Sequence, residues 1–114
     1  GMAVAIAMLP ESKEDRLRKI YNLVGTGLHV SEAVPAAFGI ILICDGDNWE
    51  SVCEAVNVGY DTDTVAAIVG SIVGALKGTA GISEELFEIL NRENEIALEE
   101  TAEKVTALVY DKMK

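Results

Sequence analysis

The stretch that decides the fold is DTDTVAAIVGSIVGALKG, residues 61–78. Its apolar residues are not interrupted by any charge between Asp63 and Lys77, and no proline breaks them. This pattern predicts a helix that begins near Asp61, ends at Gly78 and is apolar almost all round, as expected of a helix at the centre of a domain. Small residues recur every fourth position along one ridge, and each interior glycine costs about 1 kcal/mol relative to alanine. The ridge therefore predicts that another helix crosses at close range. Its members are Ala66, Gly70, Gly74 and Gly78.

Upstream of this stretch, the apolar residues again recur at helical spacing. A helix is predicted from Ser12 to the glycine-containing turn at 25–27. Pro35 is expected at the first position of the next helix, which opens the buried run 36–44. The turn at 45–48 is expected to end in Asn48 as the cap of a third helix, which Gly59 terminates.

Downstream, Ser83 is predicted to cap a short amphipathic helix, and a longer helix follows. No segment alternates with a period of two, and no internal repeat is present. The predicted fold is an all-α helical bundle with one domain over residues 2–114, and Gly1 is interpreted as the scar of a cleaved tag. The apolar side of the longer helix is expected to face inward and comprises Leu98, Ala102, Val105, Leu108 and Val109.

The charge and hydropathy of the chain exclude several classes of partner. Nine basic residues against 19 acidic ones give a net charge of −10, which argues against duplex nucleic acid and against anionic membranes. The longest apolar runs fall short of the ~20 residues that a spanning helix needs, so no span is expected. Cys44 and Cys53 are interpreted as two reduced thiols, as expected of a cytoplasmic protein. Mean hydropathy is nevertheless high, at +0.27. This surplus predicts an apolar face that another protein surface covers.

Asp61, Thr62, Asp63 and Thr64 are the one place where hard oxygen ligands cluster beside glycine and a buried element. Asp and Thr are also favoured as helix caps, because they accept hydrogen bonds from free backbone N–H groups and complement the helix dipole. Alternatively, Asp61, Asp63 and Thr64 could present three oxygens to Mg²⁺, with the other ligands supplied by water, substrate or another segment. These four residues alone leave both interpretations open.

A second motif overlaps the same residues. Asp61, Asp63 and Val65 partly match the DxDx[TV] pattern of haloacid dehalogenase-type phosphatases, in which the first aspartate is a nucleophile and the second a general acid. That motif follows a buried strand, whereas residues 54–60 have the pattern of the end of an amphipathic helix. The context therefore disfavours a phosphatase.

Residues 55–70, AVNVGYDTDTVAAIVG, continue through Gly74 to Gly78 and resemble the C-terminal signature of the ADP-ribosylglycohydrolase family. The segments 34–38 and 82–84 resemble the family's flanking helix and turn. The resemblance implies an all-α bundle around a two-magnesium site, with Asp61, Asp63 and Thr64 as metal ligands and Asp61 or Asp63 orienting a water molecule. The implied substrate is an ADP-ribosylated protein or a small molecule that contains ADP-ribose, and the implied reaction is hydrolysis of its glycosidic bond.

Two departures from the family pattern qualify this expectation. Tyr60 stands where members usually carry a second glycine, and the family's N-terminal Thr-Asp-Asp-type cluster has no counterpart in this chain. The chain thus resembles the C-terminal part of such an enzyme. We expect one or two Mg²⁺ ions with further ligands from outside the chain, and either a homo-oligomer or a separately encoded N-terminal half. The alternative is a non-catalytic helical assembly module, or a relic fragment that oligomerises through exposed apolar faces.

Overall fold

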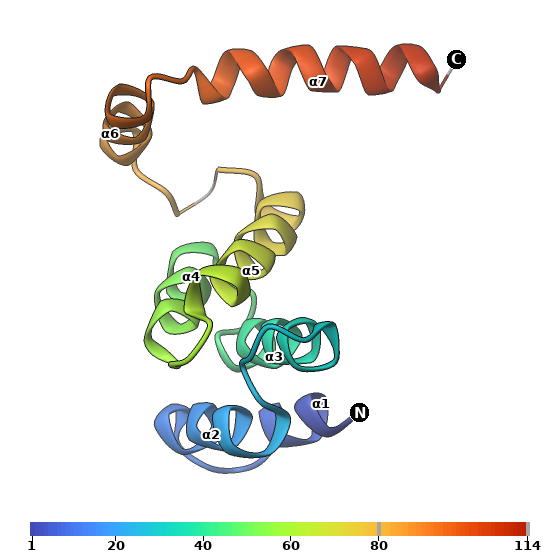
Figure 1. Ribbon diagram of the computed structural model, residues 1–114, viewed down its shortest axis with the longest axis vertical. Helices are drawn as coiled ribbons and strands as arrows, with labels where there is room; N and C mark the ends of the chain where they lie inside the picture. Colours follow the sequence, from blue (N-terminus) through green and yellow to red (C-terminus); the bar gives the residue numbers. More distant parts are fainter. Residues whose placement is uncertain (80, 114) are drawn as a thin grey trace. The chain divides into compact units, whose positions relative to one another are not determined.

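The computed structural model describes residues 1–79 and 81–113, and within these ranges it contains helices and no strand. The predicted all-α fold is therefore confirmed. One element, η1, is a π-helix that continues directly from α2. Figure 1 shows α1 (Met2–Ala7), α2 (Lys13–Lys19), η1 (Ile20–Val24), α3 (Val30–Ile43), α4 (Asn48–Asn57), α5 (Thr62–Lys77), α6 (Glu84–Asn94) and α7 (Leu98–Lys112).

The chain divides into two compact units, Gly1–Gly81 with α1 to α5 and Ile82–Lys114 with α6 and α7. A single domain over residues 2–114 would require these units to pack together, and it stays a prediction. None of the described helices has the length and apolar character needed to cross a bilayer.

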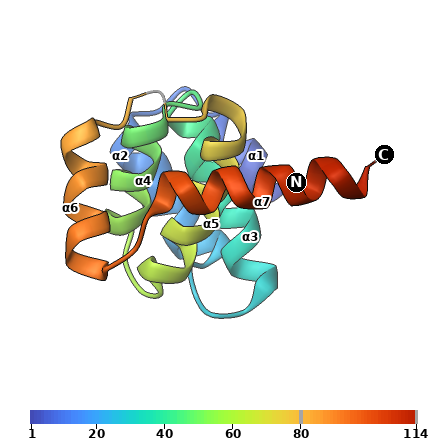
Figure 2. The same cartoon turned by 90° about the horizontal axis from the view of Figure 1, so that it is seen from above.

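The first unit is built around one apolar core. α5 packs against α4 and α3, and α1 packs against α3; Figures 1 and 2 show these helices side by side. The fully buried side chains are mainly β-branched, and their burial supplies most of the driving force for folding of the unit. The largest of the apolar ones are Ile20, Ile40, Val65, Val69 and Val73.

The buried side of α5 is one stripe, which corrects the prediction of a helix covered all round. Val65, Val69 and Val73 are fully buried, whereas Ala67 and Ser71 are exposed. A methyl group added at Gly70 would meet only Val52 at 3.9 Å, and one added at Gly74 would find no atom of the described residues within 4 Å. The close helix crossing predicted at the glycine ridge is thus absent from the described part of the chain.

Two predicted helix starts also differ from the structure. α3 begins at Val30, so Pro35 lies in its second turn and not at its first position. The cap of α4 is Asp47, whose carboxylate accepts the Glu50 N–H at 2.9 Å. Asn48 is buried instead, and its side-chain amide donates to the Gly78 carbonyl at 3.0 Å, which ties the start of α4 to the end of α5. The start and end of α5 and the Ser83 cap of α6 agree with prediction.

The second unit has no buried residue in either helix. The side-chain oxygen of Asn91 accepts the Leu98 N–H at 2.9 Å and links α6 to α7. Val105 and Val109, expected to face inward, are each more than half exposed. Within the described residues of the second unit, the inward-facing side predicted for this helix is therefore not buried.

Candidate metal site at the start of α5

The candidate ligands lie where the turn that follows α4 continues into the first turn of α5. This stretch, residues 59–64, is called here the Asp61 turn. Gly59 and Tyr60 have φ values of +102° and +70°, so two consecutive residues adopt backbone conformations that favour glycine. The Thr62 N–H donates to the Tyr60 carbonyl at 3.0 Å. This backbone path delivers Asp61 to the N-cap position of α5.

The Asp61 side chain does not act as a helix cap. Ser12, Asp47 and Ser83 each accept the backbone N–H three residues further on, at 2.9–3.2 Å. Asp61 makes no such bond, and its Oδ2 atom is buried without a hydrogen-bond partner among the described residues. A buried carboxylate oxygen without a partner is costly, because it loses its hydration and gains nothing in exchange. The capping interpretation therefore does not account for this side chain.

Asp63 and Thr64 follow in the first turn of α5, Asp63 exposed and Thr64 partly buried. The pKa of Asp63 lies below its usual value, chiefly because the Asp61 side chain is within hydrogen-bonding reach, and further because the N–H groups of Thr64 and of Asp63 itself favour the charged form. Asp63 is therefore a carboxylate at neutral pH. The donor set in this turn is two carboxyl groups and one hydroxyl, all hard oxygen donors.

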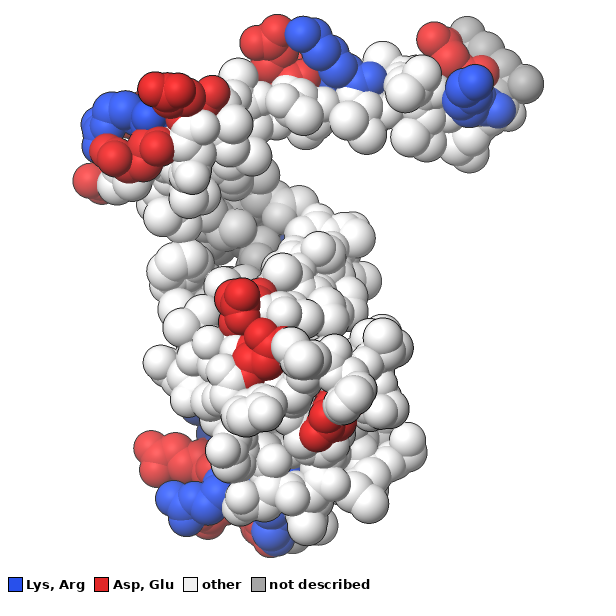
Figure 3. Space-filling model, in the orientation of Figure 1, with Lys and Arg blue, Asp and Glu red and all other residues white. Residues whose placement is uncertain are grey.

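No cation in the part of the chain that the structure describes neutralises these groups. Within residues 1–79 and 81–113, neither Asp61 nor Asp63 forms an ion pair, whereas Lys13 pairs with Glu50 and Glu54 at 2.7 and 3.4 Å. Figure 3 shows acidic side chains on the face of the first unit without basic ones beside them, while the basic side chains gather at the end that carries α2. The described residues contain no group of three His, Cys, Asp or Glu side chains able to hold a metal ion. The turn can thus supply only part of a metal's ligands.

Two hollows adjoin the Asp61 turn, and Tyr60 lines both. The first, about 280 Å³, also includes Tyr21, Asn22, Glu32 and the loop 25–27. The second, about 290 Å³, is formed by Leu28, Tyr60 and Asp61. From the sequence, the loop 25–27 could line a substrate cleft, although a turn that ends a helix suffices to explain it. Its proximity to Asp61, more than 30 residues away, has no local signal in the sequence.

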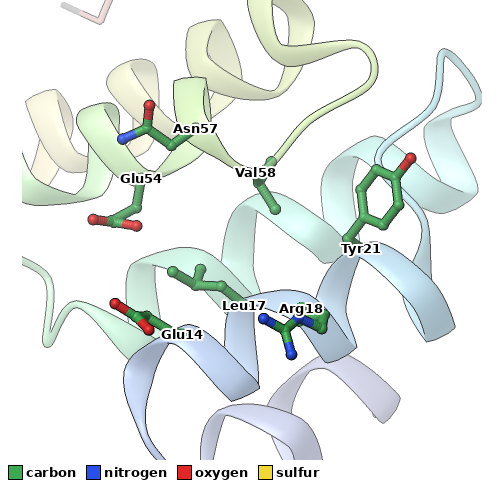
Figure 4. A pocket seen from close by; sticks show the side chains of 7 residues that line it. All are labelled: Glu14, Leu17, Arg18, Tyr21, Glu54, Asn57 and Val58. Carbon is green, nitrogen blue, oxygen red and sulfur yellow. The ribbon is translucent and has the colours of Figure 1, made fainter.

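A third hollow of about 270 Å³ lies between α2 and α4 (Figure 4). Glu14, Arg18 and Glu54 point toward it, and Tyr21 closes one end. None of residues 59–64 lines it. Glu54 in this hollow pairs with Lys13 at 3.4 Å, so this carboxylate has a cationic partner, unlike those of the Asp61 turn.

The model of the ADP-ribosylglycohydrolase family matches residues 2–113. The chain belongs to the ADP-ribosylglycohydrolase family. It is also 30% identical over 95 residues to the uncharacterized protein YegU of Escherichia coli (strain K12), and the match covers 83% of this chain and 28% of YegU. No solved structure matches the chain. The matched part of this chain thus spans little more than a quarter of the length of this relative.

In this member of the family, replacing Tyr60 by glycine is expected to stabilise the first unit by about 1 kcal/mol, because a left-handed conformation costs a non-glycine residue roughly 1–2 kcal/mol. The Tyr60 side chain is 78% exposed, so little burial is lost. Urea unfolding followed by the fluorescence of the single tryptophan, Trp49, measures the change.

Tyr60→Ala is the matched control. Alanine removes the same ring and retains the Cβ atom that makes positive φ costly, so its stability should not exceed that of the wild type. Equal stabilisation by glycine and alanine would contradict the assignment of strain to the backbone.

Proposed function

We propose that this chain forms one side of a magnesium-dependent ADP-ribosylglycohydrolase site, with Asp61, Asp63 and Thr64 as ligands and the remaining ligands supplied from outside the chain. The observation that carries the proposal is the buried Asp61 Oδ2 atom, which has no hydrogen-bond partner in the described structure at a position where its neighbours in sequence are also oxygen donors. A bound cation would provide the partner that the protein does not.

The Asp61 turn offers the type of ligand atom that Mg²⁺ prefers and the number of carboxylates that proteins usually supply to it. Mg²⁺ prefers about six oxygens at roughly 2.0–2.1 Å, and proteins usually supply one or two carboxylates while water or substrate completes the shell. The lowered pKa of Asp63 keeps this ligand charged at acidic pH as well, where protons compete with a cation for an ordinary aspartate. One or two ions are compatible with a donor set that is shared with residues outside the chain.

The proposed reaction adds one water molecule across the bond between the anomeric carbon of ADP-ribose and the acceptor atom. When bound, magnesium orients the ribose hydroxyls and the water and offsets developing charge. In this chain, Asp61 and Asp63 would hold the ions, and one of the two carboxylates would orient the attacking water. The hollows on either side of Tyr60 offer space for part of the substrate. The substrate is an ADP-ribosylated protein or an ADP-ribose-containing small molecule.

The test is release of ADP-ribose from an ADP-ribosylated protein in the presence of Mg²⁺. The chain is assayed alone and together with a separately expressed polypeptide that carries a Thr-Asp-Asp-type cluster of the family. We expect release in the combined sample and a loss of about 100-fold or more with Asp61→Asn, because the oxygen that binds the metal is then replaced. Release that is unaffected by Asp61→Asn or by removal of Mg²⁺ would refute the assignment.

A non-catalytic assembly module is the second candidate, and the exposed apolar surface favours it. Leu28, Val30 and Leu76 are all at least two-thirds exposed, which is typical of faces that another protein surface covers. In this case the chain would self-associate, as measured by sedimentation at micromolar concentration, and would neither release ADP-ribose nor respond to Mg²⁺.

A further inference from the structure

The loop at residues 25–27 is hydrogen-bonded to the Asp61 turn on both sides of Tyr60. The Thr26 hydroxyl donates to the Gly59 carbonyl at 2.8 Å, and the Asp61 N–H donates to the Thr26 carbonyl at 3.1 Å. Thr26 is 2% exposed, so both bonds are shielded from water. Thr26 is thus hydrogen-bonded to both ends of the stretch 59–61.

The close approach of the loop to the turn depends on glycine at several positions. A Cβ atom at Gly27 would lie 3.2 Å from a ring carbon of Tyr60 and 2.8 Å from Oε2 of Glu32. A Cβ atom at Gly59 would lie 3.2 Å from the ring of Tyr21. The loop and the turn are thus closely packed against the side chains of Glu32, Tyr60 and Tyr21, beside the two bonds of Thr26.

The turn needs an external support because of its own backbone. Gly59 and Tyr60 both have positive φ, and such conformations persist only where the surroundings enforce them. In the other caps of this chain the acidic or hydroxyl side chain stabilises the helix start itself. At α5, Thr26 supports the turn through the backbone, and the Oδ2 atom of Asp61 has no hydrogen-bond partner among the described residues.

We infer that Thr26 is a positioning residue for the metal site: it holds the backbone on either side of Tyr60 so that Asp61 presents its carboxylate to the cation. This inference rests on the proposed function, because it assigns Thr26 a role through Asp61 and gives it no contact with metal or substrate.

The test compares Mg²⁺ binding, measured by titration calorimetry, in the wild-type chain and in Thr26→Val. Valine keeps the shape of the side chain and removes the hydroxyl donor. We expect the dissociation constant for Mg²⁺ to rise about tenfold or more, the usual effect of losing a group that orients a ligand. Thr26→Ser restores the donor and should bind as the wild type does. Thr26→Ala, which also lacks the hydroxyl, repeats the test in a smaller side chain if valine does not fold.

Asn48→Ala is the matched control for general loss of stability. It removes a buried side-chain-to-backbone hydrogen bond at the other end of α5, from the Asn48 amide to the Gly78 carbonyl. Trp49 fluorescence is expected to show that Asn48→Ala and the Thr26 variants without the hydroxyl are destabilised. Only those Thr26 variants should bind Mg²⁺ more weakly.

Three outcomes would overturn the inference. If Thr26→Val binds Mg²⁺ as tightly as the wild type, Thr26 does not position the ligand, although the proposed metal site stands. If Asn48→Ala weakens binding equally, the effect is one of global stability. If the wild-type chain itself binds no Mg²⁺, the proposed metal site fails, and the role of Thr26 fails with it.

Discussion

Replacing Asp61 by asparagine is expected to abolish the stabilisation that Mg²⁺ gives to the wild-type chain. A ligand that binds only the folded state at one hundred times its dissociation constant stabilises that state by about 2.7 kcal/mol. Asparagine is as good a helix cap as aspartate and has nearly the same shape, so the fold and any capping role survive the change. What is lost is the negative charge that a divalent cation requires. The measurement is the shift in Tm on adding Mg²⁺, followed by Trp49 fluorescence and reversed by a chelator.

Asp47→Asn is the matched control for this experiment. Asp47 is a true cap, because its carboxylate accepts the Glu50 N–H, and it lies at the start of α4. Its replacement by asparagine should leave the Mg²⁺-dependent shift in Tm unchanged. An equal shift in the wild type and in Asp61→Asn would show that the buried oxygen of Asp61 does not bind the ion.

Replacing Ile40 by alanine is expected to lower the free energy of unfolding of the first unit by about 3–4 kcal/mol. Ile40 is fully buried in α3 (0% exposed), and truncation of a buried isoleucine loses its transfer free energy and leaves a cavity. This loss is a large fraction of the stability of a small unit. Urea unfolding monitored by Trp49 fluorescence gives the value.

Leu42→Ala, two residues along the same helix, is the control. Leu42 is 43% exposed, so its truncation should cost about 1 kcal/mol or less because little of its surface leaves water on folding. Equal losses at the two positions would contradict the arrangement of α3 in which Ile40 faces the core and Leu42 faces away from it.

Local chemistry made the helix boundaries at α5 and α6 predictable from sequence. Asp61 and Gly78 bound α5, and Ser83 begins α6, because caps and glycines act on backbone groups only a few residues away. Where two neighbouring residues could both cap, as Asp47 and Asn48 can, the sequence does not distinguish them. The carbonyl of Gly78 decides the case, because it takes the Asn48 amide as its donor and leaves the cap to Asp47.

The candidate ligands could be named from the sequence, but the sequence could not distinguish a helix cap from a metal site. The pattern at residues 61–64 is compatible with both a cap and a metal site, since both use the same oxygen atoms. Only the coordinates show that the Asp61 side chain makes no cap bond and that one of its oxygens is buried without a partner. The support from Thr26 was not predicted, because a hydrogen bond between residues 33 positions apart leaves no periodic signal.

The sequence by itself determined the all-α class and the helix at residues 62–77, because these follow from spacing and from local backbone chemistry that neighbouring residues decide. The family was identified separately, from the resemblance of residues 55–78 to its C-terminal signature. Only the tertiary structure shows which side of α5 is buried. It also shows which residues of the run 36–44 face the core and which are exposed. It also decided which backbone groups hold the Asp61 turn. These properties depend on atoms that are distant in the chain and are brought together by packing. A local pattern of residues therefore does not predict them.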